Sequence, residues 1–98
     1  MLHMIVMTHG AETCAAINKT SSEMLKTAMS RMDEVLKKYQ CFIQGAWVDP
    51  PAHAFYIVAD APNAHVVNQV MEDLKFMHWN TVDVHAIVKL EDAMGLAA

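Results

Sequence analysis

Residues 2–9, Leu-His-Met-Ile-Val-Met-Thr-His, are the stretch that decides the fold. Side chains alternate between the two faces of a β-strand, so even-numbered and odd-numbered residues would lie on opposite faces. The two sets are Leu2/Met4/Val6/Thr8 and His3/Ile5/Met7/His9. Both are mainly apolar, which indicates a central strand covered on both sides. The stretch is too short to span a bilayer and lacks the features of a signal peptide, so we expect a soluble cytoplasmic protein.

Length and composition indicate one domain, residues 1–98, that associates with a second copy of itself. The chain is 54% hydrophobic and only 18% charged, and it contains nine methionines. A domain of this size has a small interior, so an excess of apolar side chains favours burial against a partner. We therefore expect a homodimer.

Charge and cysteine content exclude several kinds of partner and fold. The net charge is −4 and there are seven Lys or Arg residues, too few for a basic nucleic-acid or membrane surface. We therefore expect neither nucleic acid nor membrane as a partner. Two cysteines, Cys14 and Cys41, do not make a disulfide framework.

The rest of the chain reads as helix, two strands, helix and strand. A helix is predicted over 21–39, with Thr20 and Glu23 at capping-box spacing and Ser21 and Ser22 as rival caps. Strands are predicted over 41–48 and 54–59, separated by prolines 50 and 51. Asp60 is the predicted cap of a second helix, with Pro62 in its first turn. A last strand is predicted over 81–90 and a tail or short turn over 91–98.

This β-α-β-β-α-β order predicts an α+β, ferredoxin-like fold with antiparallel sheet order 4-1-3-2 and both helices on one face. We expect two wholly apolar sets against the helices: Leu2/Met4/Val6 and Val82/Val84/Ala86/Val88. The other face would carry His3, Ile5, Met7, His9, Asp83, His85, Ile87 and Gln44. It is too apolar to be bare in water, so two such faces would close into a dimeric α/β barrel.

Residues 54–63 read Ala-Phe-Tyr-Ile-Val-Ala-Asp-Ala-Pro-Asn, and they are followed by the second helix and a last strand that ends at Met94. In this segment and in its order of elements, the chain resembles the dimeric α/β-barrel superfamily. It is most similar to small bacterial and archaeal domains of about ninety residues. The superfamily includes cofactor-free monooxygenases, isomerases, haem-degrading enzymes and stress-responsive barrels. Because one fold hosts many functions, the resemblance transfers no catalytic residue to this sequence.

The predicted topology brings chemically useful side chains to one end of the sheet. That end would hold His9, Cys14, Trp47, His53 and the segment His78-Trp79-Asn80, with His85 and Asp83 on the open face nearby. Imidazole and thiolate together suit zinc, copper or iron, and three protein ligands would leave one position open. We therefore name His9, Cys14, His53 and His85 as candidate metal ligands. Met7 is a possible soft ligand for Cu(I).

Other functions use the same residues without a metal. His9, His53 or His85 would be a catalytic general base for a small aromatic or quinone-like molecule in the barrel cavity. Trp47, Tyr56 and Trp79 are the candidate walls of that ligand-binding site. A third possibility is a non-catalytic dimer in which the histidines are structural and Cys14 is an ordinary loop residue.

Overall fold

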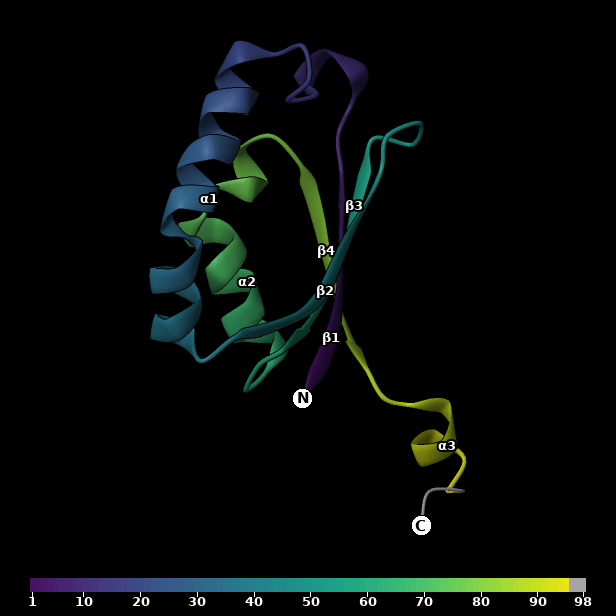
Figure 1. Ribbon diagram of the computed structural model, residues 1–98. Helices are drawn as coiled ribbons and strands as arrows, with labels where there is room; N and C mark the ends of the chain where they lie inside the picture. Colours follow the sequence, from purple (N-terminus) through teal and green to yellow (C-terminus); the bar gives the residue numbers. More distant parts are fainter. Residues whose placement is uncertain (96–98) are drawn as a thin grey trace.

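The computed structural model describes residues 1–95 as a four-stranded antiparallel sheet with two long helices on one face (Figure 1). The strands are β1 (Leu2–Thr8), β2 (Phe42–Asp49), β3 (Ala54–Asp60) and β4 (Thr81–Ile87). The helices are α1 (Lys19–Tyr39), α2 (Ala64–Asp73) and α3 (Leu90–Ala93), with 3-10 turns η1 (Ala11–Thr13) and η2 (Phe76–His78). The predicted α+β class and order of strands and long helices are confirmed.

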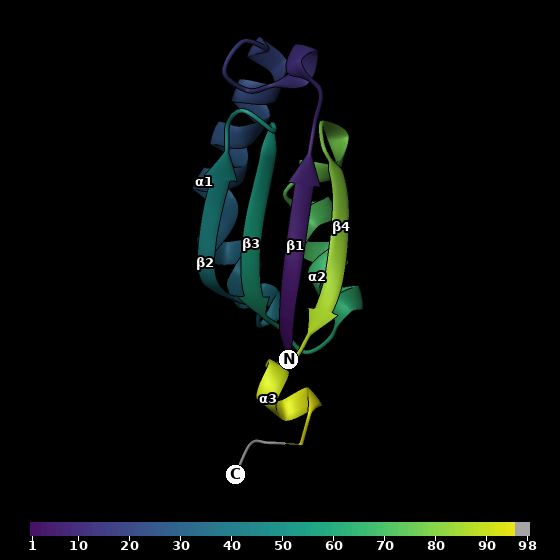
Figure 2. The same ribbon diagram turned by 90° about the vertical axis from the view of Figure 1, so that its right-hand side faces the viewer.

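The sheet order is β2-β3-β1-β4, which is the predicted order read from the opposite edge (Figure 2). β1 is central, as residues 2–9 predicted, and pairs antiparallel with both β3 and β4. In the middle of the sheet, Ile5 lies between Ile57 and Val84. This arrangement is compatible with a ferredoxin-like fold.

The predicted orientation of β1 is wrong. His3, Ile5 and Met7 are the buried set that faces the helices, whereas Leu2, Met4 and Val6 are only half-buried. Because both faces of this strand are apolar, hydrophobicity does not determine which face packs against the helices. A shift of one residue in the strand register exchanges the two faces. The prediction that Val82 and Val84 face the helices is correct, since both pack against the core.

The second strand also departs from simple alternation. A β-bulge between Ile43 and Gly45 lets Ile43 and Ala46, three residues apart, pair with core-facing residues of β3. Trp47 then pairs with Tyr56 on the open face. An extra residue in one strand exchanges the core-facing and open-facing positions of the residues that follow it. The alternation of apolar and polar residues in the sequence does not reveal such a bulge.

Both long helices begin at asparagines, Asn18 and Asn63, and not at the predicted caps. Asn18 Oδ1 accepts a hydrogen bond from the Ser21 amide at 2.9 Å, so α1 starts two residues earlier than predicted and Thr20 lies inside it. Asn63 Oδ1 accepts from the Val66 amide at 2.9 Å, and it replaces Asp60 as the cap of α2. Each asparagine satisfies an otherwise unpaired amide of the first turn.

The C-terminal region differs from its prediction. β4 ends at Ile87 rather than residue 90, and α3 projects away from the body of the molecule (Figure 1). Residues 96–98 of the predicted tail lie outside the described residues. Within 1–95, no helix has both the length and the apolar composition needed to cross a bilayer.

His3 offers a test of the reversed β1 orientation. It is 0% exposed, and neither ring nitrogen has a hydrogen-bond partner. Its neighbours across the sheet are Ala59 and Ala86, whose small side chains leave room for the ring. A buried polar group without a partner destabilises a fold by about 1–3 kcal/mol. His3→Leu should therefore raise the free energy of unfolding in urea by about 1–2 kcal/mol.

The control is His65→Leu, because His65 is exposed on α2 and its replacement should change stability by less than about 0.5 kcal/mol. A stability loss for His3→Leu would contradict the structure, because it would mean that the imidazole forms favourable hydrogen bonds.

Candidate metal centre

Three side chains from separate segments meet at one end of the sheet: His9, Cys14 and His53. One nitrogen of each imidazole and the Cys14 Sγ lie within 4.8 Å of one another. Around a tetrahedral zinc ion, ligand atoms are about 3.5 Å apart, given metal–ligand bonds of roughly 2.0–2.3 Å. Small side-chain rotations would therefore bring these three atoms to coordinating distance.

His9 lies just beyond β1 and is held by a hydrogen bond to Asn80. The His9 Nδ1–Asn80 Oδ1 distance is 2.9 Å, and Asn80 Nδ2 donates to the Phe76 carbonyl at 3.1 Å. That second bond orients the amide so that its oxygen faces the imidazole, which makes Nδ1 the protonated nitrogen. The lone pair is then on Nε2, which is buried and has no protein partner. Histidine ligands in metal sites are commonly oriented in this way.

His53 is positioned by a strained turn between β2 and β3. Its φ is 51°, in the left-handed region that residues other than glycine adopt infrequently. The His53 amide donates to the Pro50 carbonyl at 3.1 Å, and the His53 carbonyl accepts from the His9 amide at 3.2 Å. Strained backbone of this kind is concentrated at functional sites. His53 and His9 therefore contact each other twice. Their backbones share the hydrogen bond from the His9 amide, and their ring centroids are 5.4 Å apart.

Cys14 follows η1 and is fixed by the turn that leads into α1. Its amide donates to the Ala11 carbonyl, and its carbonyl accepts from the Asn18 amide at 2.8 Å. Asn18 is also the cap of α1, so the start of that helix and the position of the thiol are coupled. The thiol is partly exposed.

A hollow of about 380 Å³ lies in front of the three side chains. Its wall includes His9, Cys14 and His53, together with Val48 and Phe55. The Phe55 ring is 5.9 Å from the His9 ring and 6.1 Å from the Trp79 ring. A metal held by the three ligands would thus have space beside it for a water molecule or a small exogenous ligand.

The remaining predicted site residues are distributed differently. Trp79 is buried next to the site, with its ring centroid 5.3 Å from that of His9, but it is not among the residues that line the hollow. His85 pairs with Met4 in the middle of the sheet, on the open face, and is not part of the cluster. Trp47 and Tyr56 are also on the open face, 60% and 36% exposed. Of these three, only Trp47 was predicted at the end of the sheet with His9, and that prediction is wrong. His85 lies on the open face as predicted, but it is not grouped with the other candidate ligands.

The methionine and barrel predictions also need correction. Met7 and Ile5 belong to the core beneath the helices, so neither lines a cavity on the open face. Met7 is not among the residues that line the hollow beside His9. The role of Asn80 was not predicted, because the sequence shows only an amide directly before a strand and reveals neither its burial nor its contact with His9.

The two cysteines differ in environment, which gives a measurable prediction. Cys41 is 2% exposed, as expected of a core residue, and burial raises the pKa of its thiol, with a further contribution from the negative charge of Asp60. Burial favours the neutral thiol over the thiolate, which is the reactive form. In the native protein, a disulfide reagent such as DTNB should modify Cys14 and leave Cys41 unmodified until the chain is unfolded. Peptide mass spectrometry identifies the labelled residue.

The same shift predicts the direction of a pH effect. Below the ordinary cysteine pKa of about 8.5, both folded and unfolded chains keep the Cys41 proton, so its contribution to stability is complete. As the pH rises further, the unfolded chain loses the proton first and stability falls until the folded thiol also ionises. Cys41→Val should reduce this alkaline loss in urea titrations, whereas Cys14→Ser should leave it unchanged. Equal losses in both variants would contradict the prediction.

Comparison with known proteins supports the fold and no more. No family model matches the sequence, and no curated protein matches it. The solved structure of SCO4226 from Streptomyces coelicolor A3(2) superposes with a TM-score of 0.56 at 19% identity, covering 89% of this chain and 96% of that one. This chain is therefore a small α+β domain similar in structure to that protein. Formyltetrahydrofolate deformylase from Burkholderia mallei ATCC 23344 has a TM-score of 0.36 and 11% identity, over 96% of this chain and 34% of that one. Such a score supports no inference.

Proposed function

We propose that this protein binds one transition-metal ion per chain through His9, Cys14 and His53. The observation that carries the proposal is the meeting of their three ligand atoms within 4.8 Å from three separate segments. Two imidazoles and a thiolate suit zinc, copper or iron. The hollow beside them leaves a coordination position open, which is typical of a carrier or catalytic site rather than a closed structural one.

The arrangement around His9 supports the proposal independently. Asn80 occupies Nδ1 and leaves Nε2 buried without a protein partner. A buried acceptor without a partner is unfavourable in the free protein. Coordination of a metal by Nε2 would satisfy it.

We further propose that the protein is a homodimer in which the open faces of two sheets pack together as an α/β barrel. Leu2, Met4, Val6, Tyr56 and Trp47 project from this face, which the helices leave uncovered (Figure 2). A sheet with one solvated face normally alternates apolar and polar residues, whereas the open face here is mainly apolar and carries Asp83 and His85 among its few polar side chains. Light scattering should give a mass of twice the chain's 10.9 kDa, and a monomer at micromolar concentration would contradict the dimer.

Metal content tests the main proposal. Tag-free protein, purified without chelator and with the thiols reduced, should contain about one zinc, copper or iron ion per chain by mass spectrometry. Metal-free protein should take up Zn(II), Cu(I) or Fe(II) to the same stoichiometry, and the bound metal should slow modification of Cys14. A protein that binds none of these ions would overturn the proposal and favour the acid–base role for His9 and His53.

His53→Gly is the informative ligand deletion. Glycine adopts a positive φ without strain, so this variant removes the imidazole and introduces no backbone strain in the turn. It should fold at least as well as wild type and bind metal more weakly. His85→Ala is the matched control, because His85 lies on the open face away from the cluster.

A further inference from the structure

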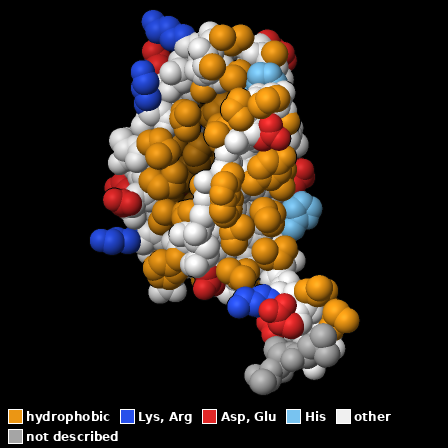
Figure 3. All heavy atoms as spheres, turned by 45° about the vertical axis from the view of Figure 1, so that its right-hand side comes forward, with side chains coloured by type: hydrophobic (Ala, Val, Ile, Leu, Met, Phe, Trp, Pro, Cys, Tyr) orange, Lys and Arg blue, Asp and Glu red, His pale blue; other side chains and the backbone are white. Residues whose placement is uncertain are grey.

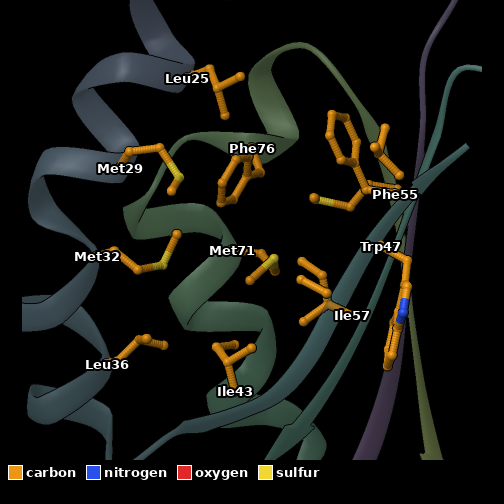
Figure 4. Close-up of a pocket in the computed structure, with 13 residues that line it drawn as sticks. Leu25, Met29, Met32, Leu36, Ile43, Trp47, Phe55, Ile57, Met71 and Phe76 are labelled. Carbon is orange, nitrogen blue, oxygen red and sulfur yellow. The ribbon is translucent and has the colours of Figure 1, made fainter. Parts of the chain in front are cut away.

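A larger cavity, separate from the hollow beside His9, lies between α1 and the sheet (Figures 3 and 4). Its volume is about 480 Å³, within the range of roughly 300–1,000 Å³ typical of small-molecule sites. In Figure 3, hydrophobic side chains surround a recess on this side of the molecule. The recess is open to solvent, and a concave apolar surface of this size is typical of a ligand-binding site.

Side chains from both layers point into the cavity. Met29 and Met32 project from α1, and Ile57 and Phe55 face them from β3 (Figure 4). Met71 of α2 lies at the back of the cavity. Among the described residues, none with a charged side chain contributes to the lining. Any molecule bound here would meet hydrocarbon and sulfur almost everywhere.

This lining decides what kind of occupant fits. A peptide segment would bring backbone N–H and C=O groups, and the lining has almost nothing to pair them with. A charged or strongly polar molecule would lose its hydration for the same reason. Methionine side chains are flexible and polarisable, so they adapt to apolar molecules of different shapes.

We propose that this cavity is a binding site for a small, uncharged and predominantly hydrocarbon molecule. The site lies mainly on the helix side of the sheet, and Trp47 of β2 borders both this cavity and the open face proposed to form the dimer. The cavity shares the Val48 and Phe55 side chains with the hollow beside His9, so an occupant would lie directly behind one wall of the metal site. The proposal does not depend on metal binding.

A neutral fluorescent probe, N-phenyl-1-naphthylamine, tests the site. Its emission should rise saturably, with one probe per chain, and 1-dodecanol should displace it. Ala46→Phe places a phenyl group into the cavity from β2 and should weaken probe binding at least tenfold. Ala52→Phe is the matched control, because the same substitution in the exposed β2–β3 turn should leave binding unchanged. Met32→Phe provides a second filling variant from α1 should Ala46→Phe fail to fold.

Further comparisons separate this proposal from the other two. Binding should be the same in metal-free protein and in Val6→Lys, which alters the open face. Non-saturable binding would overturn the proposal, as would equal binding by both filling variants and wild type. Loss of binding in Val6→Lys would place the probe at the dimer interface instead and would also overturn it.

Discussion

Replacing His9 with asparagine should lower metal affinity by more than about 100-fold while the fold is retained. Loss of residues that only orient a ligand typically reduces metal affinity about 10–100-fold, and loss of the ligand itself should exceed that. The asparagine amide can still donate a hydrogen bond to Asn80 Oδ1, which accepts from Nδ1 in the native protein. It has no atom equivalent to Nε2, so the variant removes the coordinating lone pair and keeps the supporting contact.

Asn80→Ala makes the complementary change. It keeps the imidazole but removes the bond that holds it, so metal affinity should fall by about 10–100-fold. Competition with a chromogenic chelator measures both variants, and circular dichroism checks their fold. The expected order of affinity is wild type and His85→Ala, then Asn80→Ala, then His9→Asn. Equal affinity in all four proteins would exclude His9 as a ligand.

The second large effect is expected from Val6→Lys, which should convert the proposed dimer to a monomer. Val6 lies on the open face of the central strand, between Tyr56 and Asp83. In a two-fold interface the same surface occurs twice, so each substitution introduces two charges. The Asp83 carboxylate lies opposite each new ammonium group, but closing the interface would remove both charges from water. That desolvation is unfavourable by roughly several kcal/mol per ion and exceeds the attraction between the two charges, so we expect more than about a 100-fold rise in the dissociation constant.

Light scattering across a concentration series measures this effect. Ile17→Lys is the control, because Ile17 is 76% exposed in the segment before α1, outside the sheet. It should remain dimeric. If Val6→Lys also stayed dimeric, the open face would not be the interface, and another surface would have to cover these apolar side chains.

The elements were predictable because their signals are local. The three-four spacing from Leu25 to Tyr39 predicts α1 within two residues of its start, and prolines 50 and 51 end β2 where the hairpin turns. The proximity of His9, Cys14 and His53 was predictable once the order of the strands had been predicted. It follows from the order of the strands, because the end of β1 and the β2–β3 turn must occupy the same end of the sheet.

Other features needed the three-dimensional structure. The bulge between Ile43 and Gly45 changes which residues of β2 face the core, and it depends on pairing with β3 rather than on any single residue. From the sequence, Asn80 is only part of a predicted connector. Its hydrogen bonds with His9 and Phe76 in the structure show that it orients the His9 ring. The cavity between α1 and the sheet depends on how far apart two layers pack, which no periodicity encodes.

The sequence by itself determined the class of fold, the order of strands and the end of the sheet at which the candidate ligands gather. These follow from short-range periodicity and from the few ways in which such elements connect. Only the tertiary structure decided which face of β1 turns inward and that His85, Trp47 and Tyr56 lie away from the cluster. Both faces of that strand are apolar, so hydrophobicity does not discriminate between them. The choice depends on packing against neighbouring strands and helices, where alanines 59 and 86 make room for His3.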